Sequence, residues 1–323
     1  MNEMALLTKD TAIMSAFFLV GPTATGKSAV AQRLAEDDQF DIVSADSMLV
    51  YRGMDLGTAK PTCEDRARAR YWCMDLVDAG SLFSVGLFRN SALAAISQIA
   101  MSGRKAIVAG GTGLYIKALT HGLSQTPPAD PVFRAELDRI AGSQPVAELQ
   151  SMLNKLAPEL YNALSDKLNP RRLVRALELA HTGIRQPPAS WKHENTGPMI
   201  TGLRLDPAQL KMRIVQRARN MFKTGLIDEV KVLLAAGFGQ SPTARSAIGY
   251  TEAIALLNGS LTEEDAVQQT ARRTFQLARR QMTWFRHQAN VDWIDIDIGM
   301  DAATIAGAVK ESWRKHGPAP IVR

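Results

Sequence analysis

Residues 21–28 have the types and spacing of a phosphate-binding loop. They read Gly-Pro-Thr-Ala-Thr-Gly-Lys-Ser, the complete pattern G-x-x-x-x-G-K-S. Glycine takes the backbone angles that turn successive N–H groups inward, and the Lys27 ammonium adds a full positive charge. A helical pattern begins at Ser28, so the positive end of a helix dipole points at the same place. We expect a di- or triphosphate to bind Gly21, Pro22, Thr23, Ala24, Thr25, Gly26, Lys27 and Ser28.

Phosphate loops usually bind ATP or GTP together with Mg²⁺. The serine or threonine of the loop and a carboxylate after a neighbouring strand hold the metal ion. Ser28 is the ligand expected in the loop, and Asp46 is a candidate for the carboxylate. The stretch 110–113, Gly-Gly-Thr-Gly, offers no acid. Asp46 is thus the acid expected at a strand end that faces the loop.

Short apolar runs alternate with helical patterns through the first 120 residues. The runs are 17–20, 41–44 and 105–109, and helical patterns such as 28–36 and 88–101 lie between them. This rhythm predicts an α/β fold with a parallel sheet and crossover helices. Ligands of such sheets bind beyond the carboxyl ends of the strands. We therefore expect the site to be lined by 21–28, 46–51 and 110–115.

The domain organisation is expected to be one main domain with a helical insertion. Prolines and glycines interrupt the α/β pattern at 122–131, and the residues up to about Thr182 look purely helical. We predict four segments: a disordered extension at 1–13, an α/β core at 14–121, a helical insertion at 122–200, and the rest of the core with C-terminal helices at 201–323. Beyond Leu210 the chain is expected to be helical with a weakly patterned tail.

One helix of the insertion is well delimited. Asn169 and Pro170 are typical of a helix start, and Gly183 is typical of a stop. Between them the apolar residues Leu173, Leu177 and Ala180 share one face, and two arginines lie opposite. A helix with one buried and one basic face is predicted.

Composition narrows the class of protein. The chain has 323 residues, 46% of them hydrophobic, enough for a sizeable core. Its two cysteines, Cys63 and Cys73, indicate neither a disulfide framework nor a zinc site. The apolar stretch 13–20 follows acidic residues and runs into the phosphate loop, so it is expected to be a strand rather than a signal peptide. We expect a cytoplasmic protein without a membrane segment.

The net charge of +6 is unevenly spread. Residues 169–223 hold eleven lysines and arginines against three acids, and 271–286 hold five arginines and no acid. Such clusters fit a polyanion larger than a nucleotide, because each neutralised phosphate releases counterions. Solvated helix faces are the alternative.

A family resemblance joins these features. Residues 46–61, Asp-Ser-Met-Leu-Val-Tyr-Arg-Gly-Met-Asp-Leu-Gly-Thr-Ala-Lys-Pro, closely resemble the signature of the tRNA dimethylallyltransferases, which prenylate an adenosine beside the anticodon. The resemblance continues through 21–28, 110–115, 127–131, Arg134, 169–178, 221–230, 248–250 and 279–286. It implies a sheet core like that of P-loop NTPases and a monomer that binds the anticodon stem-loop of tRNA.

The resemblance also implies the chemistry of the loop. The family uses it for dimethylallyl diphosphate, with Lys27 and Arg217 on the leaving diphosphate and Ser28 on Mg²⁺. Asp46 would be the general base for the N6 amine of the adenosine immediately 3′ of the anticodon. Two alternatives stay open: Asp46 as a magnesium ligand, and Arg217 as a helix-surface charge. A second carboxylate, Asp55, is less suited, because two carboxylates would crowd an anionic donor.

The tRNA contacts that the resemblance implies come from several segments. They are Asp46, Ser47, Met48, Leu49, Thr112, Arg134, Arg171, Arg172, Leu173, Val174, Arg175, Arg245, Ser246, Ala247, Ile248, Gly249, Tyr250, Arg279, Arg280, Gln281, Met282, Thr283, Trp284, Phe285 and Arg286. Trp284 and Phe285 suit stacking or backbone clamping, although an amphipathic helix that buries its tryptophan fits equally well.

The chain departs from the family pattern at a few places. Residues 71–75, Tyr-Trp-Cys-Met-Asp, stand where members commonly carry Pro-His-His-Leu-Ile-Asp, and both Arg171 and Leu49 stand where a glutamine is frequent. Two other functions remain open at this point. One is a small-molecule kinase that consumes ATP, and the other is a non-catalytic RNA-binding protein switched by a nucleotide.

Overall fold

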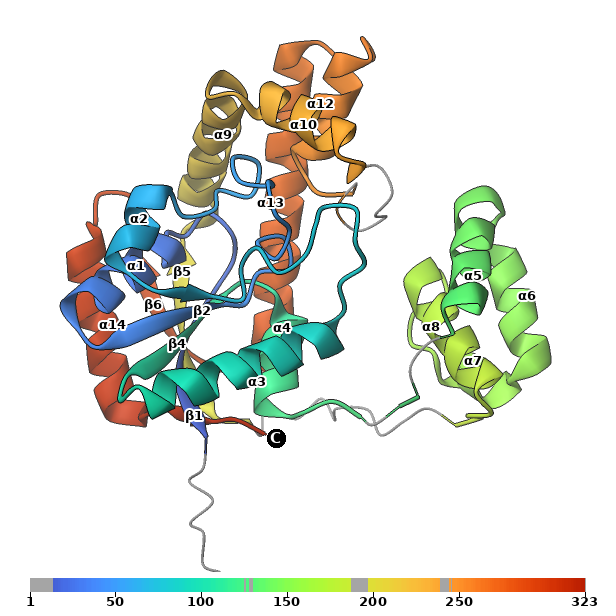
Figure 1. The fold of residues 1–323 in the computed structure, drawn as a ribbon, viewed down its shortest axis with the longest axis horizontal. Helices are drawn as coiled ribbons and strands as arrows, with labels where there is room; N and C mark the ends of the chain where they lie inside the picture. Colours follow the sequence, from blue (N-terminus) through green and yellow to red (C-terminus); the bar gives the residue numbers. More distant parts are fainter. Residues whose placement is uncertain are drawn as a thin grey trace, which may run out of the picture. The chain divides into compact units, whose positions relative to one another are not determined.

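The structure is a computed structural model that describes residues 14–124, 126–127, 130–186, 197–238, 244 and 246–322. The chain divides into two compact units. The larger comprises Met1–Gly122 and His193–Arg323, and the smaller is the insertion Leu123–Lys192 (Figure 1). The insertion was predicted to reach residue 200, but a strand that starts at Met199 pairs within the larger unit. The predicted extension 1–13 lies outside the described residues.

A seven-stranded sheet forms the centre of the larger unit as far as it is described. Six strands follow the order β3-β2-β4-β1-β5-β6 and pair in parallel, and β7 pairs antiparallel with β1. Their bounds are β1 Ser15–Val20, β2 Phe40–Ser44, β3 Tyr71–Trp72, β4 Lys105–Gly110, β5 Met199–Leu205, β6 Asn290–Ile296 and β7 Ala319–Pro320. The predicted parallel α/β sheet is confirmed.

The central strands β1, β2, β4 and β5 are largely buried on both faces, as their apolar runs require. Successive residues alternate between two cores: Leu19 and Ile107 belong to one, and Phe18 and Val108 belong to the other. The first core includes helices α1 (Lys27–Asp37) and α14 (Ala302–His316), and the second includes α3 (Val85–Met101) and α4 (Gly113–Thr120). The register pairs Val20 with Gly110. The segments after β1, β2 and β4 therefore emerge at one edge of the sheet.

Further helices of the larger unit are α2 Cys63–Arg68, α9 Pro207–Lys223, α10 Leu226–Ala235, α12 Tyr250–Leu257 and α13 Glu263–Gln288. Of these, α9, α10, α12 and the first part of α13 stand together at one end, and α2 lies beside α1 (Figure 1). Asp206 begins α9, because its side chain accepts the backbone N–H groups of Ala208 and Gln209, and Thr262 begins α13 by accepting the N–H of Asp265. Helices α9 and α13 pack against each other. They place their side chains beside the strand ends.

The insertion is helical and has a core of its own. Its helices are α5 Pro131–Ser143, α6 Val146–Leu156, α7 Pro158–Ala163 and α8 Pro170–His181. Asn169 caps α8, with its side chain accepting from the N–H of Arg171 at 3.1 Å. Leu173 and Leu177 are fully buried, while Arg171 is exposed. The predicted helix with one buried and one basic face is confirmed.

Three elements did not follow from the sequence. Strand β5 begins inside the segment expected to belong to the helical insertion, and β6 and α14 lie where helices and a weakly patterned tail were expected. Strand β6 contains Asp292 and Asp295, which break its apolar pattern, and Asp295 pairs with Arg204 of β5. No helix among the described residues is long and apolar enough to span a membrane.

Candidate active site

The phosphate loop connects β1 to α1 by a tight turn. Gly21 has φ 140°, and a side chain there would meet the carbonyl oxygen of Leu203 at 2.4 Å, so only glycine fits. Gly26 has φ 88° and immediately precedes the first helical residue, Lys27. These two turns aim the loop and the N-terminus of α1 at one cavity.

Lys27 is buried beneath the loop. Its Nζ donates to the carbonyl of Pro22 at 2.6 Å and lies 3.5 Å from Thr25 Oγ1. Burial lowers the pKa of this ammonium to about 7, against the opposing effect of the Asp46 carboxylate, and the Arg217 cation lowers it further. An anion bound in the loop would favour the charged form.

Asp46 follows β2 and is held by a local turn. The N–H of Met48 donates to Asp46 Oδ1 at 2.9 Å, and no second hydrogen bond from the described residues reaches this carboxylate. The segment is also tied to the end of β4, because the N–H of Ser47 donates to Thr112 Oγ1 at 3.0 Å. Asp46 affects the pKa of both Lys27 and Arg217, which places its charge close to both cations.

Two arginines one turn apart on α9 reach the loop cavity. Arg217 Nη2 donates to the carbonyl of Thr58 at 3.1 Å, and burial lowers the pKa of its guanidinium while Asp46 opposes this. Arg213 lies against the loop, with Nη1 3.5 Å from the carbonyl oxygen of Thr25. The surface-charge alternative for Arg217 is therefore wrong. Arg213 was not among the predicted residues, although its spacing of four from Arg217 was a usable signal.

Helix α13 closes the other side of the loop. The side-chain carbonyl of Gln281 accepts the N–H of Thr23 at 2.8 Å. A side chain on Gly111 would meet Gln281 Nε2 at 2.5 Å, and one on Gly113 would meet the Trp284 ring at 2.2 Å. The two glycines thus allow α13 to approach the end of β4.

Two cavities meet at this place, both within the larger unit. The loop cavity, of about 430 Å³, is lined by the phosphate loop, the end of β2 and the two arginines of α9. The acceptor cavity, of about 560 Å³, lies between residues 46–48, α9, residues 246–248 and α13. The residues that line both are Thr23, Asp46, Thr58, Gly111, Arg217 and Gln281. A ligand in one cavity can therefore touch a ligand in the other beside Asp46.

The loop cavity offers oxygen ligands for a metal ion. Ser28, Ser44 and Asp46 all line it, and the Ser44 hydroxyl is buried without a hydrogen-bond partner. Among the described residues, no group of three or more His, Cys, Asp or Glu could hold a metal ion by itself. Magnesium binds through few protein oxygens, several waters and the phosphates of its ligand. This set of hydroxyls and one carboxylate fits such an ion.

The predicted tRNA contacts divide by position. Those that line the acceptor cavity are Asp46, Ser47, Met48, Thr112, Ser246, Ala247, Ile248, Arg280, Gln281 and Trp284. Leu49 lines the loop cavity. Exposed ones elsewhere are Arg171, Arg172, Arg279, Thr283 and Arg286, and Met282 is half-buried. Arg245 lies outside the described residues.

Four predicted contact residues have their side chains in the hydrophobic cores. They are Leu173, Val174, Tyr250 and Phe285, each at most 1% exposed. Tyr250 donates to Glu229 Oε1 at 2.5 Å and packs against Gly57. The prediction that these four side chains contact tRNA directly is wrong, because helical periodicity turns them toward the core. Gly249 is buried too, and its N–H donates to Glu252 Oε2 to begin α12.

Arg134 and Arg175 of the insertion share one buried carboxylate. Arg134 Nη1 donates to Glu178 Oε1 at 2.9 Å, and Arg175 Nη1 donates to Glu178 Oε2 at 3.0 Å. Glu178 is 2% exposed in its side chain. Both guanidiniums are thereby fixed by a carboxylate, whereas the neighbouring Arg171 and Arg172 are exposed and pair with no carboxylate of the described residues.

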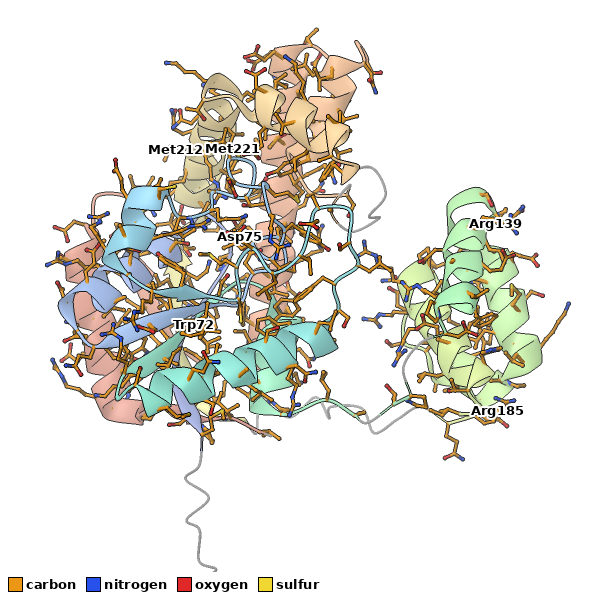
Figure 2. All side chains as sticks on the ribbon, viewed as in Figure 1. Trp72, Asp75, Arg139, Arg185, Met212 and Met221 are labelled. Atoms are coloured by element: carbon orange, nitrogen blue, oxygen red, sulfur yellow. The ribbon has the colours of Figure 1, made fainter. Side chains whose placement is uncertain are left out.

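The segment that departs from the family pattern supports the loop after β2 (Figure 2). Trp72 Nε1 donates to Asp41 Oδ2 at 3.1 Å, and Asp75 pairs with Lys60 Nζ at 2.6 Å. Lys60 also pairs with Asp55 at 2.7 Å, which removes Asp55 from the diphosphate site. Trp72 and Asp75 therefore act through a hydrogen bond and ion pairs, whereas Tyr71 and Met74 of the same segment line the loop cavity.

Comparison with known proteins decides the family. A sequence profile described as IPP transferase matches residues 49–288. The chain belongs to this family. It is 39% identical over 302 residues to tRNA dimethylallyltransferase 1 of Citrifermentans bemidjiense, covering 91% of this chain and 95% of that protein. The predicted family is confirmed, and with it an enzyme that transfers a prenyl group.

Solved structures agree with the observed fold. The tRNA isopentenylpyrophosphate transferase of Bacillus halodurans is 34% identical with a TM-score of 0.66, covering 94% of this chain and 98% of that one. A eukaryotic dimethylallyltransferase acting on tRNA shares the fold at 22% identity, with a TM-score of 0.72 and coverage of 95% and 81%. The P-loop-type core predicted from the sequence is confirmed. Membership of the family favours prenyl transfer over the kinase and the nucleotide switch.

Proposed function

We propose that this IPP transferase moves a dimethylallyl group from dimethylallyl diphosphate to the N6 amine of the adenosine immediately 3′ of the anticodon in tRNA. The observation that carries the proposal is the junction of the two cavities at Asp46 and Arg217. One cavity has the chemistry of a diphosphate site, and the other has room for a base. The reacting carbon and nitrogen would meet where the cavities share their walls.

The donor site is the loop cavity. Loop N–H groups, the N-terminus of α1, Lys27 and Arg217 would bind the diphosphate. Ser28 and Ser44 are the residues that would hold Mg²⁺ beside it, which leaves Asp46 free to act on the acceptor. A bound Mg²⁺ would neutralise part of the charge that develops on the departing diphosphate.

The acceptor site is the cavity between residues 46–48 and α13. An adenosine in a folded anticodon loop must leave its stack to react, and its pocket needs an aromatic face and polar groups for the base edge. Trp284 and the hydroxyls of Ser47 and Thr112 line the cavity and supply both. Arg280 lines the same cavity, where it can contact the RNA backbone.

The reaction follows from the positions of Asp46 and the cations. The allylic C–O bond breaks with carbocation character, and its electron pair leaves with the diphosphate. The N6 nitrogen forms the new C–N bond and loses a proton to Asp46, whose Oδ1 is oriented by Met48. Lys27 and Arg217 face the charge that grows on the leaving oxygen. Both cavities belong to one chain, which supports activity as a monomer.

The test is to incubate the purified chain with dimethylallyl diphosphate, Mg²⁺ and tRNA, and to analyse the digested tRNA by mass spectrometry. We expect one C5H8 unit on the adenosine beside the anticodon and one diphosphate released per unit. A kinase would consume ATP and leave the tRNA unchanged. A nucleotide-switched binding protein would retain tRNA without releasing diphosphate.

A further inference from the structure

We propose that Arg213 binds the distal phosphate of the prenyl donor and of the diphosphate product. The inference rests on the proposed function, since it assigns a further residue to the same donor site. Arg213 and Arg217 lie one turn apart on α9, and both line the loop cavity. Arg217 also lines the acceptor cavity, whereas Arg213 does not. Arg217 is therefore at the reacting end of the donor and Arg213 at the far end.

The contacts of Arg213 leave most of its hydrogen-bonding capacity unused. Nη1 lies 3.5 Å from the carbonyl oxygen of Thr25, and Nη2 lies 3.3 Å from that of Ile298. Both distances exceed the usual 2.9 to 3.0 Å of N–H···O bonds, so both bonds are weak. A guanidinium has five N–H donors and suits the bidentate recognition of a phosphate.

Arg213 also differs from the arginines that have structural ion pairs. No carboxylate of the described residues lies within 4 Å of it, whereas Arg204 binds both oxygens of Asp295 at 2.5 and 2.6 Å. Two like charges, Lys27 and Arg217, line the same cavity. A group of three cations with one nearby carboxylate, Asp46, is best balanced by a multivalent anion.

The position of Arg213 relative to the phosphate loop indicates that the anion it binds is a phosphate group. A side chain built on Gly26 would lie 3.7 Å from Arg213 Nη1. Gly26 immediately precedes α1, where helix N–H groups converge on a bound phosphate. A phosphate at the helix N-terminus would thus lie beside the guanidinium. To bind that phosphate, the Arg213 guanidinium has to break only its two weak hydrogen bonds to carbonyl oxygens.

A purely structural role for Arg213 would be to connect α9, the loop and the turn at Ile298. Substitution of glutamine tests between the roles, because it keeps an N–H donor and removes the charge. Arg219 is the matched control: it is an exposed arginine of the same helix that does not line the loop cavity. The probe is inorganic diphosphate with Mg²⁺, titrated calorimetrically into the full chain.

We expect Arg213→Gln to weaken diphosphate binding by ~10-fold or more, the effect of one charge-assisted bond. The KM for dimethylallyl diphosphate should rise in parallel, with the KM for tRNA and kcat little changed. Arg213→Lys should recover part of the diphosphate affinity, because lysine restores the positive charge but lacks the paired N–H groups that bind a phosphate in a bidentate way. Arg219→Gln should leave every one of these values within about twofold.

Unchanged diphosphate affinity in Arg213→Gln, with only a lower thermal midpoint, would overturn the inference in favour of the structural role. If that variant does not fold, equal affinity in Arg213→Lys and the wild type overturns it as well. Failure of the wild type to bind diphosphate or to modify tRNA would instead contradict the proposed function. The two failures are therefore distinguishable.

Discussion

The side-chain carbonyl of Gln281 accepts the backbone N–H of Thr23 at 2.8 Å, across 258 residues of chain. This bond joins α13, which lines the acceptor cavity, to the phosphate loop, which lines the loop cavity. Gln281 itself lines both cavities. Occupation of either cavity can thus alter the other through one side chain.

A negative charge at position 281 should weaken the binding of the prenyl donor. Gln281→Glu keeps the acceptor oxygen but places a negative charge beside the phosphate loop, so we expect the KM for dimethylallyl diphosphate to rise roughly tenfold or more. The control is Gln276→Glu, because Gln276 lies on the same helix and lines the acceptor cavity but not the loop cavity. Equal effects of the two changes on the donor KM would refute a local role for Gln281.

The pH dependence of donor binding should follow Lys27. Burial lowers the pKa of its ammonium to about 7. Above that pH the donor-free protein loses the cation, and bound diphosphate must restore the proton, so donor affinity should fall as pH rises from 7 to 8.5. Lys27→Met should bind the donor more weakly, and its donor affinity should no longer show the fall between pH 7 and 8.5 that Lys27 causes. Calorimetry at several pH values checks this, and parallel profiles for both proteins would exclude Lys27 as the titrating group.

A methyl group at Gly113 should destabilise the protein, because α13 packs closely against this residue. Its Cβ would lie 2.2 Å from the Trp284 ring, and the overlap should lower the free energy of unfolding by ~1 to 3 kcal/mol. Gly307→Ala is the control, because no atom lies within 4 Å of the new methyl and α14 gains a better helix former. Urea unfolding measures both. A Gly113→Ala protein as stable as the wild type would show that α13 can shift without cost.

The sequence predicted the parts of the fold that rest on local patterns. Strands β1, β2 and β4 are short apolar runs, and the loop after β1 has a fixed spacing of glycines. Strand β5 was missed because its position depends on pairing with β1, about 180 residues earlier. The edge strand β6 was missed because its two Asp residues, Asp292 and Asp295, interrupt the apolar run that a buried strand would show, and one of them pairs with Arg204.

The sequence identified which segments carry the site residues, but it did not show in which direction each side chain points. Asp46, Lys27 and Arg217 converge as expected, since each belongs to a segment at the same sheet edge. Phe285 follows Trp284 in sequence, but one position along a helix turns it into the core. The spacing of four puts Arg213 on the same face of a helix as Arg217, but only the packing of α9 against the loop shows that this face lines the loop cavity.

Exposed arginines should give tRNA binding its salt dependence. Arg171 and Arg280 are exposed, and no salt bridge within the described residues involves either. If both contact phosphates, the double alanine variant should bind tRNA more weakly, with a log-affinity that depends less steeply on log-salt by roughly 0.7 to 0.9 per contact. Arg139→Ala is the control, because Arg139 of α5 is exposed but paired with Glu136 (Figure 2). Filter binding at several salt concentrations measures the slope, and an unaltered slope would place the RNA surface elsewhere.

The central claim is that Asp46 takes the proton of the attacking amine where the two cavities meet. Single-turnover transfer by Asp46→Asn tests it most directly, with enzyme in excess over tRNA and donor saturating. We expect a rate ~10² to 10⁴-fold below the wild type, with tRNA affinity within a few-fold and no recovery at higher Mg²⁺ concentration. A rate close to the wild type, or one restored by added Mg²⁺, would contradict the assignment of Asp46 as the base.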